Sequence, residues 1–208
     1  MDSNKYLNDI SEIKSLMNKS TRFLSLSGLS GVLAGIYALI GAGFAHTIIY
    51  ASEAPSNESY KTIVLYETDM LKLFAIAFAV LVLSLITGIF FSYKKAKKNG
   101  ENIWDKTSKR LLINFLIPLA TGGFFLIFLI EKDIYAFIAP LTLIFYGLAC
   151  VNASHYTLGY TRFLGVTMLL IGLLSVWFLG YGLYFWALGF GVIHIIYGTL
   201  MYFKYDRV

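Results

Sequence analysis

The chain has 208 residues, of which 58% are hydrophobic and 14% are charged, with a mean hydropathy of +0.69 and a formal net charge of +5. Soluble domains carry roughly 25% charged residues, so this composition excludes a soluble globular protein and indicates an integral membrane protein. The lone Cys150 excludes a disulfide framework, no Cys/His spacing suggests a structural zinc site, and the positive charge is expected to reflect membrane orientation rather than binding to nucleic acid.

Residues 1–22 precede the first apolar segment and have an amphipathic pattern. Apolar side chains from Leu7 to Met17 recur at three- and four-residue spacing, with charged residues between them. The pattern favours a short amphipathic helix that lies along the inner leaflet. A helix that binds a partner and a plain surface helix are the alternatives.

Six apolar segments are long enough to cross a hydrocarbon core about 30 Å thick at 1.5 Å per residue. Each is expected to be helical because backbone polar groups cannot go unpaired in lipid. The fold class is therefore predicted as all-α, a polytopic transmembrane helical bundle in which residues 1–208 form a single membrane domain. The predicted spans are residues 23–50, 70–93, 111–130, 134–152, 163–179 and 183–203.

The first span imitates a secretory signal, with a charged leader and small residues before His46. Its apolar run exceeds the usual 7–15 residues, so a retained anchor is expected. It also carries Gly31 and Gly35 at four-residue spacing, which favours close packing between helices in lipid.

Basic residues lie on alternate sides of the predicted spans. They gather before the first span, between the second and third, between the fourth and fifth, and after the sixth, whereas acidic residues predominate in the other loops. This asymmetry predicts that both the N-terminus and the C-terminus lie on the cytoplasmic side of the membrane. A run of lysines is expected either to meet anionic lipid headgroups or to set topology alone: Lys94, Lys95, Lys97 and Lys98.

The third span carries a proline within its predicted helix. Pro118 removes the backbone donor to the carbonyl of Asn114 and is followed by Gly122 and Gly123, so a helix kink is expected. A broken helix would allow Asn114 to contact a substrate. Prolines are, however, tolerated in many membrane helices without such a role.

Glycines recur at seven-residue spacing in the last two spans. The pattern predicts that these spans form a tight hairpin across Gly180–Gly182. Packing within one subunit is favoured, and a homo-oligomer interface is the alternative. The candidate packing residues of the whole chain are Gly31, Gly35, Gly165, Gly172, Gly189 and Gly198.

His194 is the one titratable side chain deep in a span besides tyrosines and Cys150. With Asn114 it forms the candidate intramembrane polar site, although a histidine that bonds to a neighbouring helix is the commoner case. No two of the three histidines are predicted at the same depth, so haem is not expected. No cofactor and no metal site are predicted.

Catalytic signatures are absent from the sequence. No Asp, Glu, Lys or Arg lies deep in a span, which disfavours proton-coupled transport through buried carboxylates. The sequence has no HExxH or GxSxG motif and no paired intramembrane carboxylates, so no catalytic residues are predicted.

The chain has a basic loop after the second span and a glycine-rich final hairpin. In these features it resembles uncharacterised bacterial six-helix membrane proteins, a resemblance that implies no activity. Three functions stay open, the third being a membrane enzyme that acts on lipid, for which Asn152, His155 and Arg162 are the candidate polar residues at the inner interface. A non-enzymatic accessory, scaffold or regulatory module, with a homo-oligomer or another membrane protein as partner, is favoured. A transporter or channel for a small neutral or lipophilic solute is the alternative.

Overall fold

The computed structural model describes residues 27–51, 67–100, 104–157 and 160–206, and the amphipathic pattern of residues 1–22 lies outside them. The described residues are 92% helical and contain no strand. They include six helices long and apolar enough to cross a membrane, which makes the chain a multi-pass membrane protein. Five of the spans are α2 (Gly28–Ala51), α3 (Glu67–Asn99), α4 (Lys106–Glu131), α5 (Ile138–Ala153, between the 3-10 turns Tyr135–Phe137 and Ser154–Tyr156) and α6 (Tyr160–Trp177).

The sixth span is not a regular α-helix. It begins as α7 (Gly182–Trp186), widens into a π-helix, η3 (Ala187–Ile193), continues as α8 (His194–Met201) and ends in a second π-helix, η4 (Tyr202–Asp206). π-Helices are rare and occur mostly as single turns within α-helices. Two of them in one span distinguish this helix from the others in the described chain.

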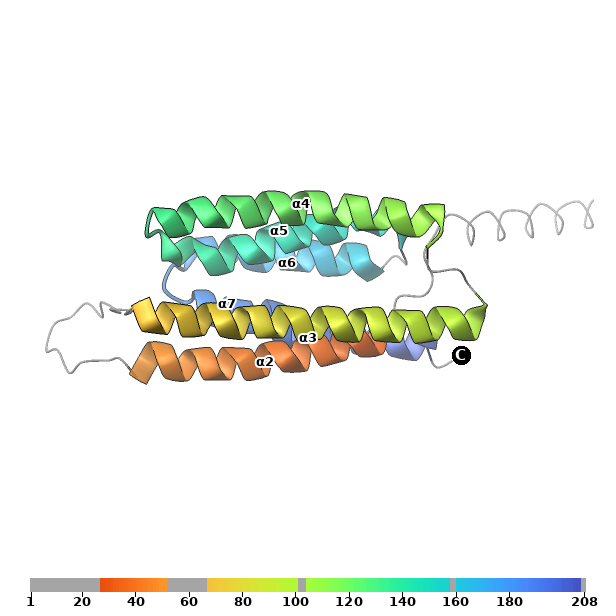
Figure 1. Ribbon diagram of the computed structural model, residues 1–208, viewed down its shortest axis with the longest axis horizontal. Helices are drawn as coiled ribbons and strands as arrows, with labels where there is room; N and C mark the ends of the chain where they lie inside the picture. The colour runs from red at the N-terminus through yellow and green to blue at the C-terminus, as the bar shows by residue number, and fades with distance from the viewer. Residues whose placement is uncertain (1–26, 52–66, 101–103, 158–159, 207–208) are drawn as a thin grey trace, which may run out of the picture.

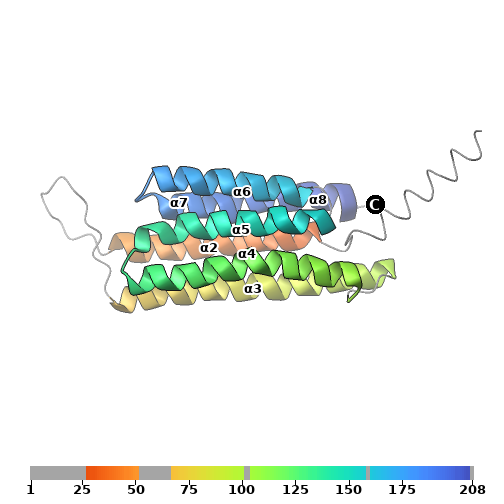
Figure 2. The ribbon, with the colours of Figure 1, turned by 90° about the horizontal axis from the view of Figure 1, so that it is seen from above.

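The six spans form two layers of three helices (Figures 1 and 2). In one layer α5 lies between α4 and α6, and in the other α2 lies between α3 and the sixth span. The layers meet where the sixth span packs on α5 and α6, around Leu143 and Met168, neither of which is exposed. Because α3 and α4 each pack mainly on one neighbour, most of their apolar side chains face outwards.

The helices extend past several of the predicted spans. Helix α3 continues beyond residue 93 through the lysine run to Asn99 and ends at Gly100, whose φ of 66° is the left-handed conformation that glycine adopts without steric cost. Helix α4 begins at Lys106, where the Asp105 carboxylate accepts a 2.6 Å hydrogen bond from the backbone N–H of Ser108. Helix α6, by contrast, ends at Trp177, two residues before the predicted boundary.

The described chain begins and ends at the same end of the bundle. The Ser27 hydroxyl donates a 3.2 Å hydrogen bond to the Asp206 carboxylate. The last turns of α3 and the first turns of α4 and α6, which carry basic residues, lie at this end too (Figure 1). Every described lysine and arginine except Lys72 and Lys132 therefore lies at one end of the molecule.

Candidate functional site

His194 lies in the interior of the bundle, where the sixth span faces α5. The residue is only 7% exposed, and both nitrogens of its ring have partners. Nε2 is 2.8 Å from the hydroxyl oxygen of Tyr146 on α5, and Nδ1 is 3.1 Å from the carbonyl oxygen of Gly189 in η3. The histidine therefore connects η3, the π-helix directly before it, to α5.

The partners of the ring determine where its proton resides. A carbonyl oxygen only accepts, so Nδ1 must carry the hydrogen that bonds Gly189. In the neutral imidazole Nε2 is then the acceptor, and the Tyr146 hydroxyl donates to it. With both nitrogens satisfied, the imidazole has no ring nitrogen left for a metal or a ligand.

Aromatic rings surround this hydrogen-bonded pair. The Phe190 ring stacks on His194 at 5.8 Å between centroids and lies 5.1 Å from the Tyr146 ring. Phe115 of α4 meets Tyr146 edge-on at 6.0 Å. The pair is thus enclosed by apolar surface from three spans, which strengthens its hydrogen bonds by excluding competing donors.

Asn114 occupies a different neighbourhood, nearer to the basic end of α4. Its side-chain amide donates to the carbonyl of Arg110 at 2.8 Å, and its backbone carbonyl accepts a 2.9 Å hydrogen bond from the Asn152 side chain of α5. No contact joins Asn114 to His194. The two residues predicted as one polar site therefore make separate interhelical or local contacts.

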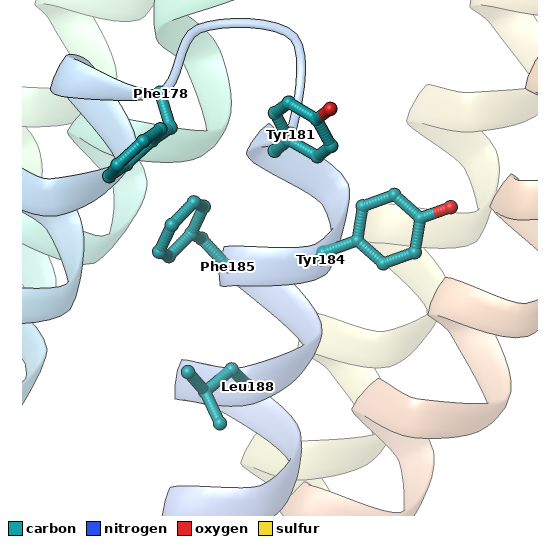
Figure 3. A pocket seen from close by; sticks show the side chains of 5 residues that line it. All are labelled: Phe178, Tyr181, Tyr184, Phe185 and Leu188. Carbon is teal, nitrogen blue, oxygen red and sulfur yellow. The ribbon is translucent and has the colours of Figure 1, made fainter.

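A shallow cavity of about 480 Å³, open to the outside of the bundle, lies beside α7 at the opposite end from the basic residues (Figure 3). Neither Asn114 nor His194 lines it. The lining residues are Phe178, Tyr181, Tyr184, Phe185 and Leu188, so the surface is almost wholly aromatic and apolar. Next to it, the Tyr184 hydroxyl is 3.3 Å from Nε2 of His46, which ties α7 to α2.

The last two spans contact one another across their short turn, but their glycines do not pack against one another as the spacing predicts. A Cβ on Gly165 would lie 2.7 Å from the carbonyl oxygen of Gly147 in α5, and one on Gly172 would lie 3.1 Å from that of Pro140. Helix α6 therefore packs its glycine face on α5. Packing is decided by the partner surface, which spacing along one helix does not reveal.

The sixth span instead turns its glycines towards α2. A Cβ on Gly198 would lie 2.5 Å from the backbone nitrogen of Val32 and close to Gly31, and one on Gly35 would lie 2.6 Å from the carbonyl oxygen of Gly191. Gly189 faces the Leu143 and Met168 side chains. All six candidate packing glycines thus lie against another helix, with an atom of that helix within 3.2 Å of an added Cβ.

Helix α4 runs unbroken through Pro118, so the broken helix that would expose a substrate site is not present. Gly122 serves packing, because a Cβ there would collide with the Phe145 ring of α5. Gly123 faces open space, with nothing within 4 Å of an added Cβ. The irregular span is the sixth, which contains no proline and gave no sequence signal of this kind.

Asp206, which the sequence did not single out, connects three spans at the basic end. Its carboxylate accepts from Nζ of Lys95 at 2.5 Å, from the backbone N–H of Gly28 at 2.9 Å and from the Ser27 hydroxyl. It thereby caps the positive end of the α2 dipole. Lys95, expected to face lipid with its neighbours, is ion-paired with its side chain only 14% exposed.

Within the four described ranges, no group of three or more His, Cys, Asp or Glu side chains is gathered that could hold a metal ion. The other two histidines lie apart from His194: His46 contacts Tyr184, and His155 is exposed in the turn after α5. No family model, curated protein or solved structure matches the chain.

Proposed function

We propose that this chain is a non-enzymatic integral membrane module, an accessory, scaffold or regulatory subunit that acts through helix packing. One observation carries the proposal: the deep polar side chain, His194, uses both ring nitrogens on neighbouring backbone and Tyr146 rather than facing a cavity. The Asn114 side chain likewise donates a hydrogen bond to a backbone carbonyl of its own helix. The backbone carbonyl of Asn114 accepts a hydrogen bond from the Asn152 side chain of α5. Polar groups placed in this way fix how helices associate in lipid.

A transporter for a small neutral or lipophilic solute is the alternative function. Its support was a kinked third span with Asn114 and His194 around a shared cavity. Helix α4 is continuous, and the cavity beside α7 is lined by neither residue. The packing module therefore accounts for these side chains better than transport does.

The proposal includes an orientation, with both ends in the cytoplasm of a bacterial inner membrane. The described basic residues gather at one end of the bundle, and loops rich in lysine and arginine stay in the cytoplasm. Lys94, Lys97 and Lys98 are exposed there and suit anionic headgroups, at about 1 kcal/mol for each cation near the surface.

Native mass spectrometry of the full chain, released from lipid nanodiscs, tests the proposed role. A packing module should leave the membrane as a defined assembly, either of copies of this chain or with a second protein at fixed stoichiometry. A chain that leaves the nanodiscs as a monomer with no second protein bound would contradict the proposed role. Solute efflux from proteoliposomes gives the complementary measurement, and flux above that of empty vesicles would favour the transporter.

A further inference from the structure

The two halves of the sixth span differ in how firmly they are held. On the basic side, α8 is fixed on α2 by backbone-to-backbone contact at Gly198, and Asp206 fixes its end. On the other side, none of the five residues of α7 is buried. The π-helix η3 lies at the junction between the fixed half and the loosely packed half.

The π-helix holds one residue more in its turn than an α-helix would. If η3 rewound into α-helix, α7 would turn by about 100° relative to α8 and move by about 1.5 Å along the axis. The α8 half cannot make this turn alone, because residues with side chains would replace Gly198 against the backbone of α2. The movement therefore belongs to α7.

The surroundings of α7 leave space for such a turn. The shallow, open cavity lies directly beside it, and Phe185 and Leu188 of the sixth span form part of its lining (Figure 3). Among the contacts that hold α7 in its present orientation are the bond from Tyr184 to His46 and the stacking of Phe185 on Phe178 at 6.2 Å. Both are at least partly exposed, where such contacts are weak.

The π form has one specific stabilising group. His194 reaches back five residues with Nδ1 to the carbonyl of Gly189, and its backbone N–H bonds the carbonyl of Gly191. Tyr146 holds the ring in place from α5. Gly189 and Gly191 also lower the intrinsic α-helical preference of the segment by roughly 1 kcal/mol each relative to alanine.

We propose that η3 is a conformational switch, in which His194 and Tyr146 latch the π form and release of the latch lets α7 rotate over the adjoining cavity. The rotation separates Tyr184 from His46 and reshapes the aromatic surface at that end of the bundle. The basic end, held by Gly198 and Asp206, keeps its structure. The inference is independent of the proposed packing role.

Distances between paired spin labels test the switch in the full chain in nanodiscs. Cys150 is kept, because it is buried and lies against Tyr146. One pair, Tyr181→Cys with Phe128→Cys, measures the start of α7 against the part of α4 at the same end of the bundle. Both positions are exposed. The other pair, Phe203→Cys with Lys98→Cys, measures the basic end. Removing Leu188 takes the extra residue out of η3, so the segment can become α-helical without turning α7 relative to α8. This variant should leave both distances unchanged and abolish the shifted population.

Milder variants address the latch itself. Tyr146→Phe removes one hydrogen bond and should raise the population of the shifted distance about fivefold; His194→Ala should raise it further. Thr199→Val, which removes a hydroxyl bonded to the carbonyl of Ile195 within α8, is the matched control and should change neither distance. Wild-type distances in both Tyr146→Phe and His194→Ala would overturn the switch. A shifted distance that persists when Leu188 is removed from the Tyr146→Phe protein would also overturn it, because no extra residue would then remain in η3 to drive the turn.

Discussion

Asp206 and Lys95 lie 111 positions apart in the sequence and form an ion pair of 2.5 Å between Oδ1 and Nζ. The carboxylate stands near the C-terminal end of its own helical span, where the helix dipole disfavours negative charge. It is stabilised because it also meets the N-terminus of α2 and the lysine that follows the apolar part of α3. One side chain thus joins the first, second and sixth spans.

Replacing Asp206 with Asn should lower the free energy of unfolding by about 1–3 kcal/mol, because Lys95 would lose its charged partner while both groups are largely shielded from water. The measurement is the denaturation midpoint in mixed micelles. Glu131→Gln, an exposed acid-to-amide change at the opposite end of the bundle, is the control and should leave the midpoint nearly unchanged. Equal effects of the two changes would contradict a stabilising role for the Asp206–Lys95 ion pair.

Gly198→Ala should destabilise the bundle by about 1–3 kcal/mol, because the added methyl group would overlap the backbone of α2. Gly43→Ala changes the same residue type in α2 at a place with nothing within 4 Å of the new Cβ. It should be neutral or slightly stabilising, because alanine favours helix over glycine. Thermal unfolding of both variants in one detergent compares them, and a Gly198→Ala protein as stable as Gly43→Ala would contradict the close approach.

Tyr146 and His194 should show energetic coupling in a double-mutant cycle. The single variants Tyr146→Phe and His194→Phe each remove one partner, and the double variant removes both. The expected coupling energy is about 0.6–1.7 kcal/mol, the size measured for interhelical hydrogen bonds in membranes. Steric trapping in bicelles provides the unfolding free energies, and additive effects within error would mean that the two side chains do not interact.

A reporter that is active only in the cytoplasm should be active when fused after Val208 and inactive when inserted at Lys132. The expectation follows from the basic residues that gather at the end of the bundle where Asp206 lies. A second reporter, active only outside the cytoplasm, should give the reverse pattern. Activity of that second reporter after Val208 would invert the orientation.

The sequence predicted the number, order and approximate bounds of the spans, because apolar length and charge distribution are properties of each segment alone. Gly100 is a further case: a glycine directly after a run of lysines favours a left-handed helix end, and α3 ends in this way. Such features depend on a few neighbouring residues.

The pairing of helices could not be predicted in the same way. The glycine spacing correctly indicated close packing but not that Gly165 faces α5 and Gly198 faces α2. Tyr146 and Asp206 gained their roles from residues tens of positions away. The π-helix depends on a balance of side-chain contacts around His194 that no periodicity in the sequence reports.

The length of α3 bears on how the bilayer itself acts on this protein. Its apolar part, residues 73–93, spans roughly 30 Å, which matches the hydrocarbon thickness, so the turns that carry the lysines project about 9 Å further. The Lys95–Asp206 pair then sits among the lipid headgroups. A thicker bilayer would draw the pair towards hydrocarbon and a thinner one would expose it to water, so membrane thickness becomes a variable that sets the strength of this contact.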